Sequence, residues 1–281
     1  MTRNRFAIAL ALIVVVPFAI GCRSSGAKHE KADPLMKLSA AESLSHGKEL
    51  MAREKWASAR KYLMHAFEVE PNSASGREAL LLVADSLYNQ GGSQNLIQAE
   101  AKYRDFLNRF PTSERAPYVQ FHIGASLAGR VERPDRDQNV TRSALAAFEE
   151  VVRLYPTSDM VDKAKEQIAA MRSKLGEHEY QVARFYLRYG IPIAAVNRLT
   201  YLVAAYPEYT PKDKVYYYLG TGYDRMHKDK EAAEWFQKLR DEFPQSEFVS
   251  EIPSSVMAKA SEEKATAPPA SGAGNSGPGG R

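Results

Sequence analysis

The chain has 281 residues, of which 44% are hydrophobic, 26% are charged and 10% are aromatic. These fractions suffice to bury a core, so the composition excludes disorder over the whole chain. The net charge of +4 comes from 38 basic and 34 acidic residues, and so small an excess gives no electrostatic argument for a nucleic-acid partner. The single cysteine, Cys22, excludes an intramolecular disulfide and a metal site built from several cysteines.

Residues 1–21 have the pattern of an export signal. Arg3 and Arg5 form a basic start, and an uncharged apolar run of 15 residues follows at 6–20. As a helix this run would be about 22 Å long, shorter than the roughly 30 Å hydrocarbon core of a bilayer, and Pro17 interrupts it. A cleaved signal peptide is therefore favoured over a membrane-spanning helix.

Cys22 directly follows Ala19, Ile20 and Gly21, and this sequence resembles the bacterial lipoprotein box. The resemblance implies cleavage before Cys22 and covalent lipid on its sulfur and amino group. Stable anchoring needs more than one acyl chain, which such a modification supplies. The alternative is an ordinary secretory signal followed by a stray cysteine. By resemblance to proteobacterial lipoproteins, Arg23 in place of Asp favours the outer membrane over the inner membrane.

Two segments near the ends lack the periodicity of packed elements. Residues 22–38 contain the lipidated cysteine and are expected to form a flexible tether. Gly and Pro make up eight of the 17 residues in 265–281, a composition that cannot offset the entropy cost of folding. Residues 253–281 are therefore expected to be disordered, and 39–252 are expected to be the folded part.

The folded part repeats one spacing five times. An Ala is followed four places later by a large apolar residue, three places later by another apolar residue, and five places later by Pro. Steps of four and three keep these residues on one face of a helix, and Pro ends the helix. The five copies are Ala59, Leu63, Ala66, Pro71; Ala99, Tyr103, Phe106, Pro111; Ala144, Phe148, Val151, Pro156; Ala195, Leu199, Leu202, Pro207; and Ala232, Phe236, Leu239, Pro244.

A partner helix precedes three of these helices. A small residue and a large residue lie 24 and 21 places before the proline, at Gly47 and Leu50, Ala183 and Tyr186, and Gly220 and Tyr223. Paired helices with a period of about 34 residues are typical of tetratricopeptide (TPR) repeats. The predicted fold class is therefore all-α, an α-solenoid of about five TPR repeats, which presents a concave surface suited to binding.

The five prolines are 40, 45, 51 and 37 residues apart, so every junction contains extra residues. The sequence predicts that these lie in a turn at 89–96, in a polar loop at 131–140, in a helix lengthened between residues 160 and 187, and around 208–213.

No catalytic motif is present, because the sequence lacks GxSxG, HExxH and GxxxxGK and its six histidines are scattered. His178 beside Glu179 is the nearest approach to a metal pair, but adjacent residues on a helix point in different directions. We expect no enzymatic activity, no metal and no cofactor other than the lipid on Cys22.

The TPR register assigns five positions of each repeat to the concave face. Tyr and Arg are enriched in binding hot spots, so the side chains at these positions, which include several Tyr and Arg, form a candidate protein-binding groove. A merely solvated face is the alternative for each residue. The candidates are Lys48 in the first repeat, Tyr180, Arg184 and Arg188 in the fourth, and Tyr217, Thr221 and Arg225 in the fifth.

Two segments resemble the BamD family of outer-membrane barrel-assembly lipoproteins. Residues 135–164 (DRDQNVTRSALAAFEEVVRLYPTSDMVDKA) resemble the family's DRD loop and the helix that ends in YPxS. Residues 177–207 (EHEYQVARFYLRYGIPIAAVNRLTYLVAAYP) resemble its segment that contains A-x-x-NR. The resemblance spans about residues 40–250. It implies a non-enzymatic subunit of the β-barrel assembly machinery, anchored to the inner leaflet of the outer membrane and facing the periplasm.

The resemblance also implies partners. The family's C-terminal repeats dock a POTRA domain of the barrel-inserting protein, and its N-terminal repeats receive the C-terminal signal strand of unfolded barrel proteins. Other lipoproteins are further candidate partners. Arg198, with Asn197 beside it, matches the family arginine of the POTRA contact, and a carboxylate could bind it in bidentate fashion. A local salt bridge is the alternative role of Arg198.

Two other functions fit a TPR lipoprotein. One is an adaptor for cell-envelope complexes that act in division or on peptidoglycan, but such proteins often add a coiled coil, and residues 23–40 contain no heptads. The other is the helical scaffold of a cell-wall lyase, which would need a catalytic domain that the sequence after residue 250 does not provide.

Overall fold

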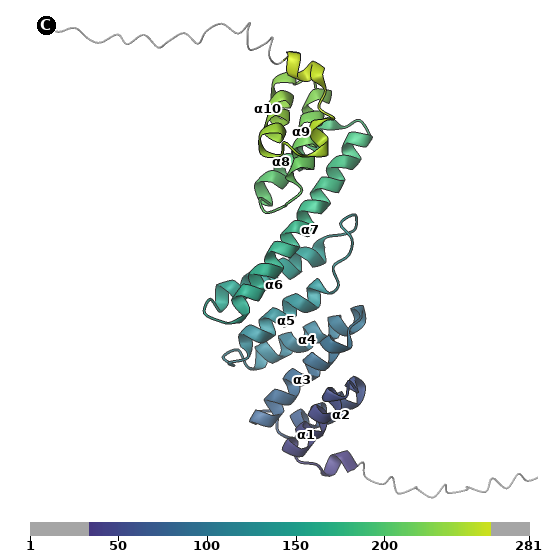
Figure 1. The fold of residues 1–281 in the computed structure, drawn as a ribbon. Helices are drawn as coiled ribbons and strands as arrows, with labels where there is room; N and C mark the ends of the chain where they lie inside the picture. The colour runs from purple at the N-terminus through teal and green to yellow at the C-terminus, as the bar shows by residue number, and fades with distance from the viewer. Residues whose placement is uncertain (1–33, 260–281) are drawn as a thin grey trace, which may run out of the picture. The chain divides into compact units, whose positions relative to one another are not determined.

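The computed structural model describes residues 34–259, and within this range it contains the ten helices α1 to α10, two short 3₁₀ turns, a further helical segment at 254–259 and no strand (Figure 1). The predicted signal peptide, Cys22 and residues 260–281 lie outside the described residues. Residues 1–37 and 38–281 form separate units. Of the first, the structure describes one 3₁₀ turn, η1 (Pro34–Lys37), inside the segment predicted to be a tether. No described helix is both long and apolar enough to cross a bilayer.

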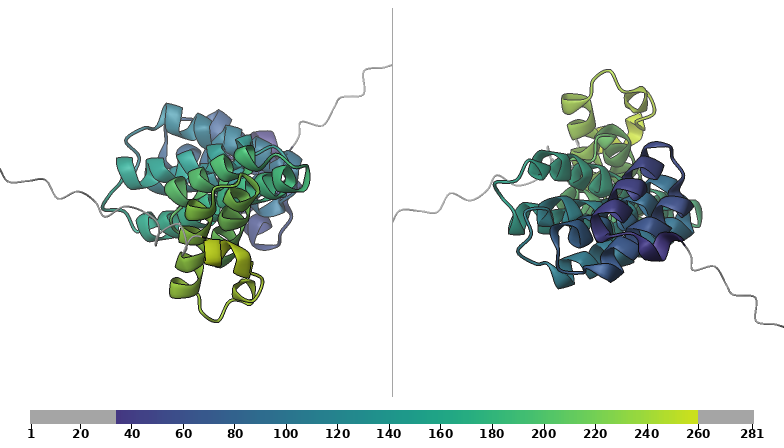
Figure 2. Two further views of the ribbon diagram at one scale, coloured as in Figure 1. Left: turned by 90° about the horizontal axis from the view of Figure 1, so that it is seen from above. Right: turned by 90° about the horizontal axis from the view of Figure 1, so that it is seen from below.

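Consecutive helices of the second unit form five helix–turn–helix pairs, and each helix packs mainly on the helices directly before and after it. Views along the stack show the pairs lying one behind another (Figure 2). The prediction of an all-α TPR-type solenoid is therefore confirmed. The pairs are α1 (Ala40–Ala52) with α2 (Trp56–Val69), α3 (Ala74–Gln90) with α4 (Ser93–Arg109), α5 (Ala116–Ala128) with α6 (Asn139–Leu154), α7 (Met160–Arg188) with α8 (Pro192–Ala205), and α9 (Lys212–Arg225) with α10 (Asp229–Glu242), followed by η2 (Glu247–Val249).

Proline ends the second helix of each pair. These helices stop two residues before Pro71, Pro111, Pro156, Pro207 and Pro244. The residue before each proline has φ between −138° and −128° and ψ between 57° and 72°, outside the helical region. The cause is steric, because the proline ring disfavours helical dihedrals in the residue that precedes it. The predicted stop signals are confirmed.

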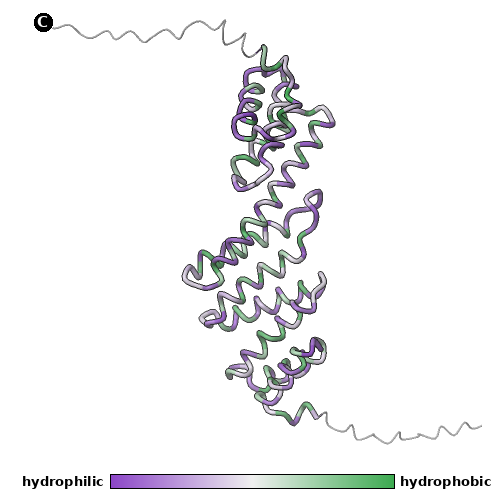
Figure 3. Tube along the Cα trace, viewed as in Figure 1, coloured by the Kyte–Doolittle hydropathy of each residue, from purple (hydrophilic) through white to green (hydrophobic). Residues whose placement is uncertain are grey.

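The repeated Ala residues and the large residues four places after them form the interior. All ten side chains are completely buried, because a methyl group lets the neighbouring helix approach closely while the large side chain fills the adjacent space. Along each helix hydrophobic and hydrophilic residues alternate accordingly (Figure 3). The ten are Ala59, Ala99, Ala144, Ala195, Ala232, Leu63, Tyr103, Phe148, Leu199 and Phe236.

Helix α7 is longer than the others, with 29 residues, as the sequence predicts for the third junction. Its first half contributes Ala164 and Met171 to a hydrophobic cluster that includes residues of α2 to α6. Its second half contributes Ala183 to a different cluster, shared with α8 and α9. Gly176 lies between the two halves, and a Cβ atom there would lie 2.9 Å from the ring of Tyr209. The glycine therefore allows the turn before α9 to pack directly on α7.

Ordered structure extends beyond the predicted boundary at residue 252. Residues 254–259 are helical, and Val256, only 2% exposed, packs in the cluster that contains Phe236 and Ile252. The prediction that disorder begins at 253 is wrong for 254–259, because Ile252 and Val256, four places apart, bury their side chains against α10.

Candidate protein-binding site

Large hydrophobic side chains are exposed around the turn between α7 and α8. Phe185 and Tyr189 of α7 are 53% and 64% exposed, and their ring centroids lie 4.4 Å apart. Ile191 in the turn and Ile193 at the start of α8 are 44% and 58% exposed. Exposed large hydrophobic residues outside α7 and α8, such as Val69 and Ile97, belong to separate helices. A group of this kind marks an interaction site more often than a single exposed residue does.

The exposed face of α8 continues this group. Ile193, Asn197 and Tyr201 are spaced by four residues, so they lie on one face of the helix, and all three are exposed. Asn197, which the sequence singled out, thus lies between two exposed apolar side chains. We call the group formed by Phe185, Tyr189, Ile191, Ile193, Asn197, Arg198 and Tyr201 the α7–α8 surface.

Arg198 is joined to a buried carboxylate of α7. Its Nη1 donates to Oε2 of Glu179 at 3.0 Å, and the Glu179 side chain is only 6% exposed. The local salt bridge left open as an alternative is therefore present. The Arg198 side chain is still 45% exposed, and a guanidinium has five N–H donors, so one such bond does not use its whole capacity. Its contact with a partner protein stays a prediction.

Tyr180 is only 5% exposed, which differs from the groove position that the register assigned to it. Its ring packs in the core next to Tyr218, with centroids 5.7 Å apart, and burial raises its pKa. The guanidinium of Arg184 lies 5.7 Å from each of these two ring centroids, and Nζ of Lys214 lies 4.0 Å from that of Tyr180. The ring of Tyr180 therefore makes cation–π contacts with Arg184 and Lys214, and Tyr180 itself offers little surface to a partner protein.

Arg188 and Arg225 lie near the C-terminal end of α7, and both are exposed. Nη1 of Arg225 donates to the carbonyl of Leu187 at 2.6 Å, and the backbone N–H of Gly190 donates to the same carbonyl at 3.2 Å, so Arg225 is a second donor to a carbonyl in the last turn of α7. The structure therefore gives Arg225 a role in ending α7, in addition to the predicted contact with a partner.

The fifth repeat is partly covered by the segment that follows it. The ring of Tyr217 stacks on that of Phe248 in η2, with centroids 5.1 Å apart, and Tyr217 is only half-buried. The hydroxyl of Thr221 donates to the carbonyl of Tyr217 at 2.9 Å. Tyr217 and Thr221 are thus engaged within the chain, and the sequence register does not reveal this.

The second and third repeats contain a groove that the sequence does not indicate, which we call the α3–α5 groove. Nζ of Lys48 lies 2.7 Å from Oε1 of Glu78, so the predicted Lys48 links α1 to one residue of this groove. The groove has a volume of about 450 Å³. Its lining is mixed, with aliphatic and aromatic side chains and two arginines: Ala74, Arg77, Glu78, Leu81, Leu82, Asp85, Phe106, Ser113, Arg115 and Tyr118.

Asp85 anchors the floor of the α3–α5 groove. Its Oδ1 accepts hydrogen bonds from the hydroxyls of Tyr103 at 2.7 Å and Tyr118 at 3.1 Å. Burial raises the pKa of Asp85, and the two hydrogen bonds act in the opposite direction. Tyr118 also contacts His122, whose pKa burial lowers to about 4. The floor is therefore a connected polar and aromatic network held by α3, α4 and α5.

His178, the nearest candidate for a metal pair, has another structural role. Its Nδ1 lies 2.6 Å from the carbonyl oxygen of Pro134, so an N–H there ties the loop before α6 to α7. In the described part of the chain, no group of three or more His, Cys, Asp or Glu residues could hold a metal ion.

Tandem helix pairs, an exposed aromatic surface and a mixed groove define a TPR-type repeat protein with surfaces suited to binding other polypeptides. Residues 36–239 match the YfiO family, described as "Outer membrane lipoprotein". Because this match covers more than half of the chain, the chain belongs to that family of outer membrane lipoproteins and is associated with the outer membrane.

Comparison with known proteins agrees with this assignment. "Outer membrane protein assembly factor BamD" of Haemophilus influenzae is 25% identical over 228 residues, which are 78% of this chain and 84% of the relative. The protein of the same name from Neisseria gonorrhoeae is 26% identical over 187 residues, 64% and 70% of the two chains. The TPR2AB-domain:pHSP90-complex of yeast Sti1 aligns over 80% of this chain and 86% of that chain, with 12% identity and a TM-score of 0.42. The family match and the two sequence relatives confirm the resemblance to the BamD family.

Proposed function

We propose that the chain is a non-enzymatic scaffold of the outer membrane β-barrel assembly machinery, anchored through lipid on Cys22 and facing the periplasm. The names of its relatives, which are outer membrane protein assembly factors, support the general role. In this proposal the α7–α8 surface binds a POTRA-bearing insertase, and the α3–α5 groove binds unfolded barrel proteins.

One observation carries the insertase contact: exposed Phe185, Tyr189 and Ile193 lie in the same helix pair as Arg198. Aromatic and Arg side chains contribute most of the binding energy at many interfaces. The salt bridge to buried Glu179 restricts the guanidinium of Arg198, so less side-chain entropy is lost when a second carboxylate binds. The partner is therefore expected to present an acidic residue beside an apolar patch.

The chemistry of the α3–α5 groove supports its proposed role with unfolded chains. Leu82 and Tyr118 offer apolar surface, and Arg77 and Arg115 offer positive charge that suits a carboxylate. The two carboxylates of the lining are engaged elsewhere, Glu78 with Lys48 and Asp85 with two tyrosine hydroxyls. The groove's volume of about 450 Å³ is within the range of pockets that bind drug-sized ligands.

Co-purification from detergent-solubilised outer membranes tests both contacts. Arg198→Glu, and separately Phe185→Ser with Tyr189→Ser, should remove the POTRA-bearing insertase. Ile97→Ser, a substitution of an equally exposed apolar residue on α4, should retain it. Retention by every variant would contradict the insertase contact. Recovery of division or peptidoglycan proteins in place of the insertase would favour the adaptor function.

The groove needs a separate measurement. Arg77→Glu with Arg115→Glu should retain the insertase but should lose binding to a synthetic peptide that copies the C-terminal strand of a barrel protein. Unchanged peptide binding would contradict the assignment of the α3–α5 groove.

A further inference from the structure

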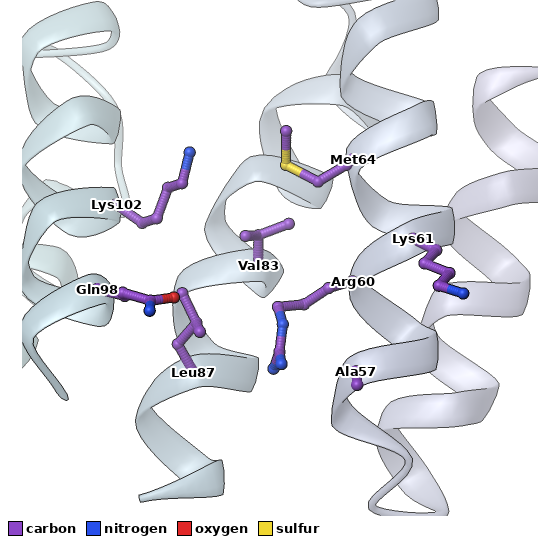
Figure 4. Close-up of a pocket in the computed structure, with 8 residues that line it drawn as sticks. All are labelled: Ala57, Arg60, Lys61, Met64, Val83, Leu87, Gln98 and Lys102. Atoms are coloured by element: carbon purple, nitrogen blue, oxygen red, sulfur yellow. The ribbon is translucent and has the colours of Figure 1, made fainter. Parts of the chain in front are cut away.

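A second groove lies on the opposite face of α3, between α2 and α4. Val83 and Leu87 form its floor, and they point away from Leu81 and Asp85 of the α3–α5 groove because residues two apart on a helix lie on different faces. Its volume is about 400 Å³. We call it the α2–α4 groove, and it is lined by Ala57, Arg60, Lys61, Met64, Val83, Leu87, Gln98 and Lys102 (Figure 4).

The lining carries three positive charges, Arg60, Lys61 and Lys102, and no carboxylate is among the described residues that form it. None of the three forms an ion pair within residues 34–259, whereas Arg104 and Arg109, also on α4, pair with carboxylates of that helix. Among the described residues, therefore, no ion pair neutralises the charge of these three side chains.

Arg60 is the most constrained of these cations. It reaches from α2 into the space that faces α4 (Figure 4), and its Nη1 donates to the neutral hydroxyl of Ser86 at a long 3.4 Å. Burial lowers the pKa of Arg60, which is the direction expected for a cation partly removed from water without a counter-ion. A carboxylate placed in the groove would compensate for that loss of hydration.

The other lining groups suit a peptide more than a lipid surface. Met64 is half-buried, and its flexible thioether adapts to varied apolar side chains. Gln98 points toward the groove (Figure 4) and has both a donor and an acceptor for a peptide backbone.

We propose that the α2–α4 groove binds an acidic polypeptide segment of a partner protein, with an apolar side chain between its carboxylates. This site is distinct from the two surfaces of the proposed function and does not depend on them.

Fluorescence anisotropy with the full chain purified in detergent tests the proposal. The probe is the fluorescein-labelled peptide GEDLEDLG, and its uncharged analogue is GQNLQNLG. We expect the acidic peptide to bind about tenfold more tightly than the analogue, a difference of about 1.4 kcal/mol. Its affinity should fall as salt rises, because the contacts are between partly exposed charges. Equal affinity for the two peptides would overturn the proposal.

Matched variants locate the binding. Lys61→Glu with Lys102→Glu should weaken binding of GEDLEDLG at least tenfold, whereas Lys163→Glu with Lys174→Glu, two exposed lysines of α7, should leave it unchanged. Circular dichroism of both variants checks that the helices are intact. Equal losses in both variants would show nonspecific attraction to positive charge and would overturn the assignment.

A lipid competitor separates the two kinds of anionic ligand. Vesicles of phosphatidylcholine alone and of phosphatidylcholine with one quarter phosphatidylglycerol are added to the complex of the chain with GEDLEDLG. Retention of the peptide in both cases supports a peptide site. Displacement by the anionic vesicles alone would assign the groove to a membrane surface and would overturn the proposal.

Discussion

Replacing Tyr209 with Phe should destabilise the C-terminal repeats by removing a single hydroxyl. Tyr209 is 1% exposed, and its hydroxyl donates to Oε2 of Glu177 on α7. The same carboxylate also accepts hydrogen bonds from Gln181 at 3.0 Å and from Lys214 at 3.1 Å. The substitution keeps the ring against α7 and removes one of three donors, so it isolates the contribution of this hydrogen bond.

Hydrogen bonds to charged groups contribute about 1.5–3 kcal/mol. The Glu177 side chain is 29% exposed and keeps two other donors, so we expect the lower end, about 1.5 kcal/mol. With a urea dependence of about 2 kcal/mol per molar, the unfolding midpoint should fall by about 0.7 M.

The effect should depend on pH. Burial alone would raise the pKa of Glu177, but the hydrogen bonds from Tyr209, Gln181 and Lys214 lower it overall. The stabilisation is therefore complete above the pKa of the unfolded chain, about 4.3, and is lost as the pH falls through the lower pKa of the folded chain. The difference between Tyr209→Phe and the parent chain should thus be largest near pH 7 and should shrink in acid.

The two tryptophans permit a local assay. Trp56 lies in α2, and Trp235 lies in α10. In a Trp56→Phe background, urea unfolding followed by Trp235 fluorescence reports on the C-terminal repeats. Tyr189→Phe is the matched control, because Tyr189 is 64% exposed and should leave the midpoint unchanged. Equal midpoints for Tyr209→Phe and the control at pH 7 would refute the assigned role of the hydroxyl.

Three further predictions concern stability. Burial lowers the pKa of His122 to about 4, below the unfolded value of about 6.5. The free energy of unfolding should therefore fall by up to about 3 kcal/mol as the pH drops from about 6.5 to about 4. His122→Phe should remove this dependence, which urea midpoints at several pH values will test. Phe148→Ala should cost about 3–5 kcal/mol, measured by urea unfolding, because the ring is completely buried; a cost below 1 kcal/mol would contradict its place in the core. Lys48→Ala should cost at most about 1 kcal/mol, because both partners of its ion pair with Glu78 are about half exposed, and added salt should reduce the difference.

The helix boundaries could be predicted from the sequence because proline acts locally. Its effect on the preceding residue needs no tertiary information, and all five stops occur where the sequence places them. The partner helix of the third repeat is a different case. A Cβ atom at Gly124 would lie 2.8 Å from the ring of Phe148, so this glycine, like Gly47 and Gly220, makes room for a large side chain of the second helix. However, Gly124 lies 32 residues before Pro156, whereas the other two lie 24 residues before their prolines. The loop between α5 and α6 lengthens this spacing and conceals the match.

The candidate surfaces could be predicted only in part because exposure depends on neighbouring elements. Tyr180 occupies a groove position in the register, yet Tyr218 from α9 packs beside it. Phe185 and Tyr189 carry a local signal, since they are aromatic residues four places apart on a helix face that does not contain the core residues Ala183 and Leu187. That signal distinguishes these exposed aromatic residues from buried ones only once the core face of α7 is known.

The uninterrupted course of α7 has a mechanical consequence. At about 1.5 Å per residue its 29 residues extend about 43 Å, from the cluster shared with the earlier repeats to the turn that carries Tyr189. No loop interrupts this span to absorb a rotation, so a tilt of about 10° imposed at one end would displace the other end by about 7 Å. A protein that binds at the turn and tilts it would therefore move the first half of α7 and the earlier repeats packed on it.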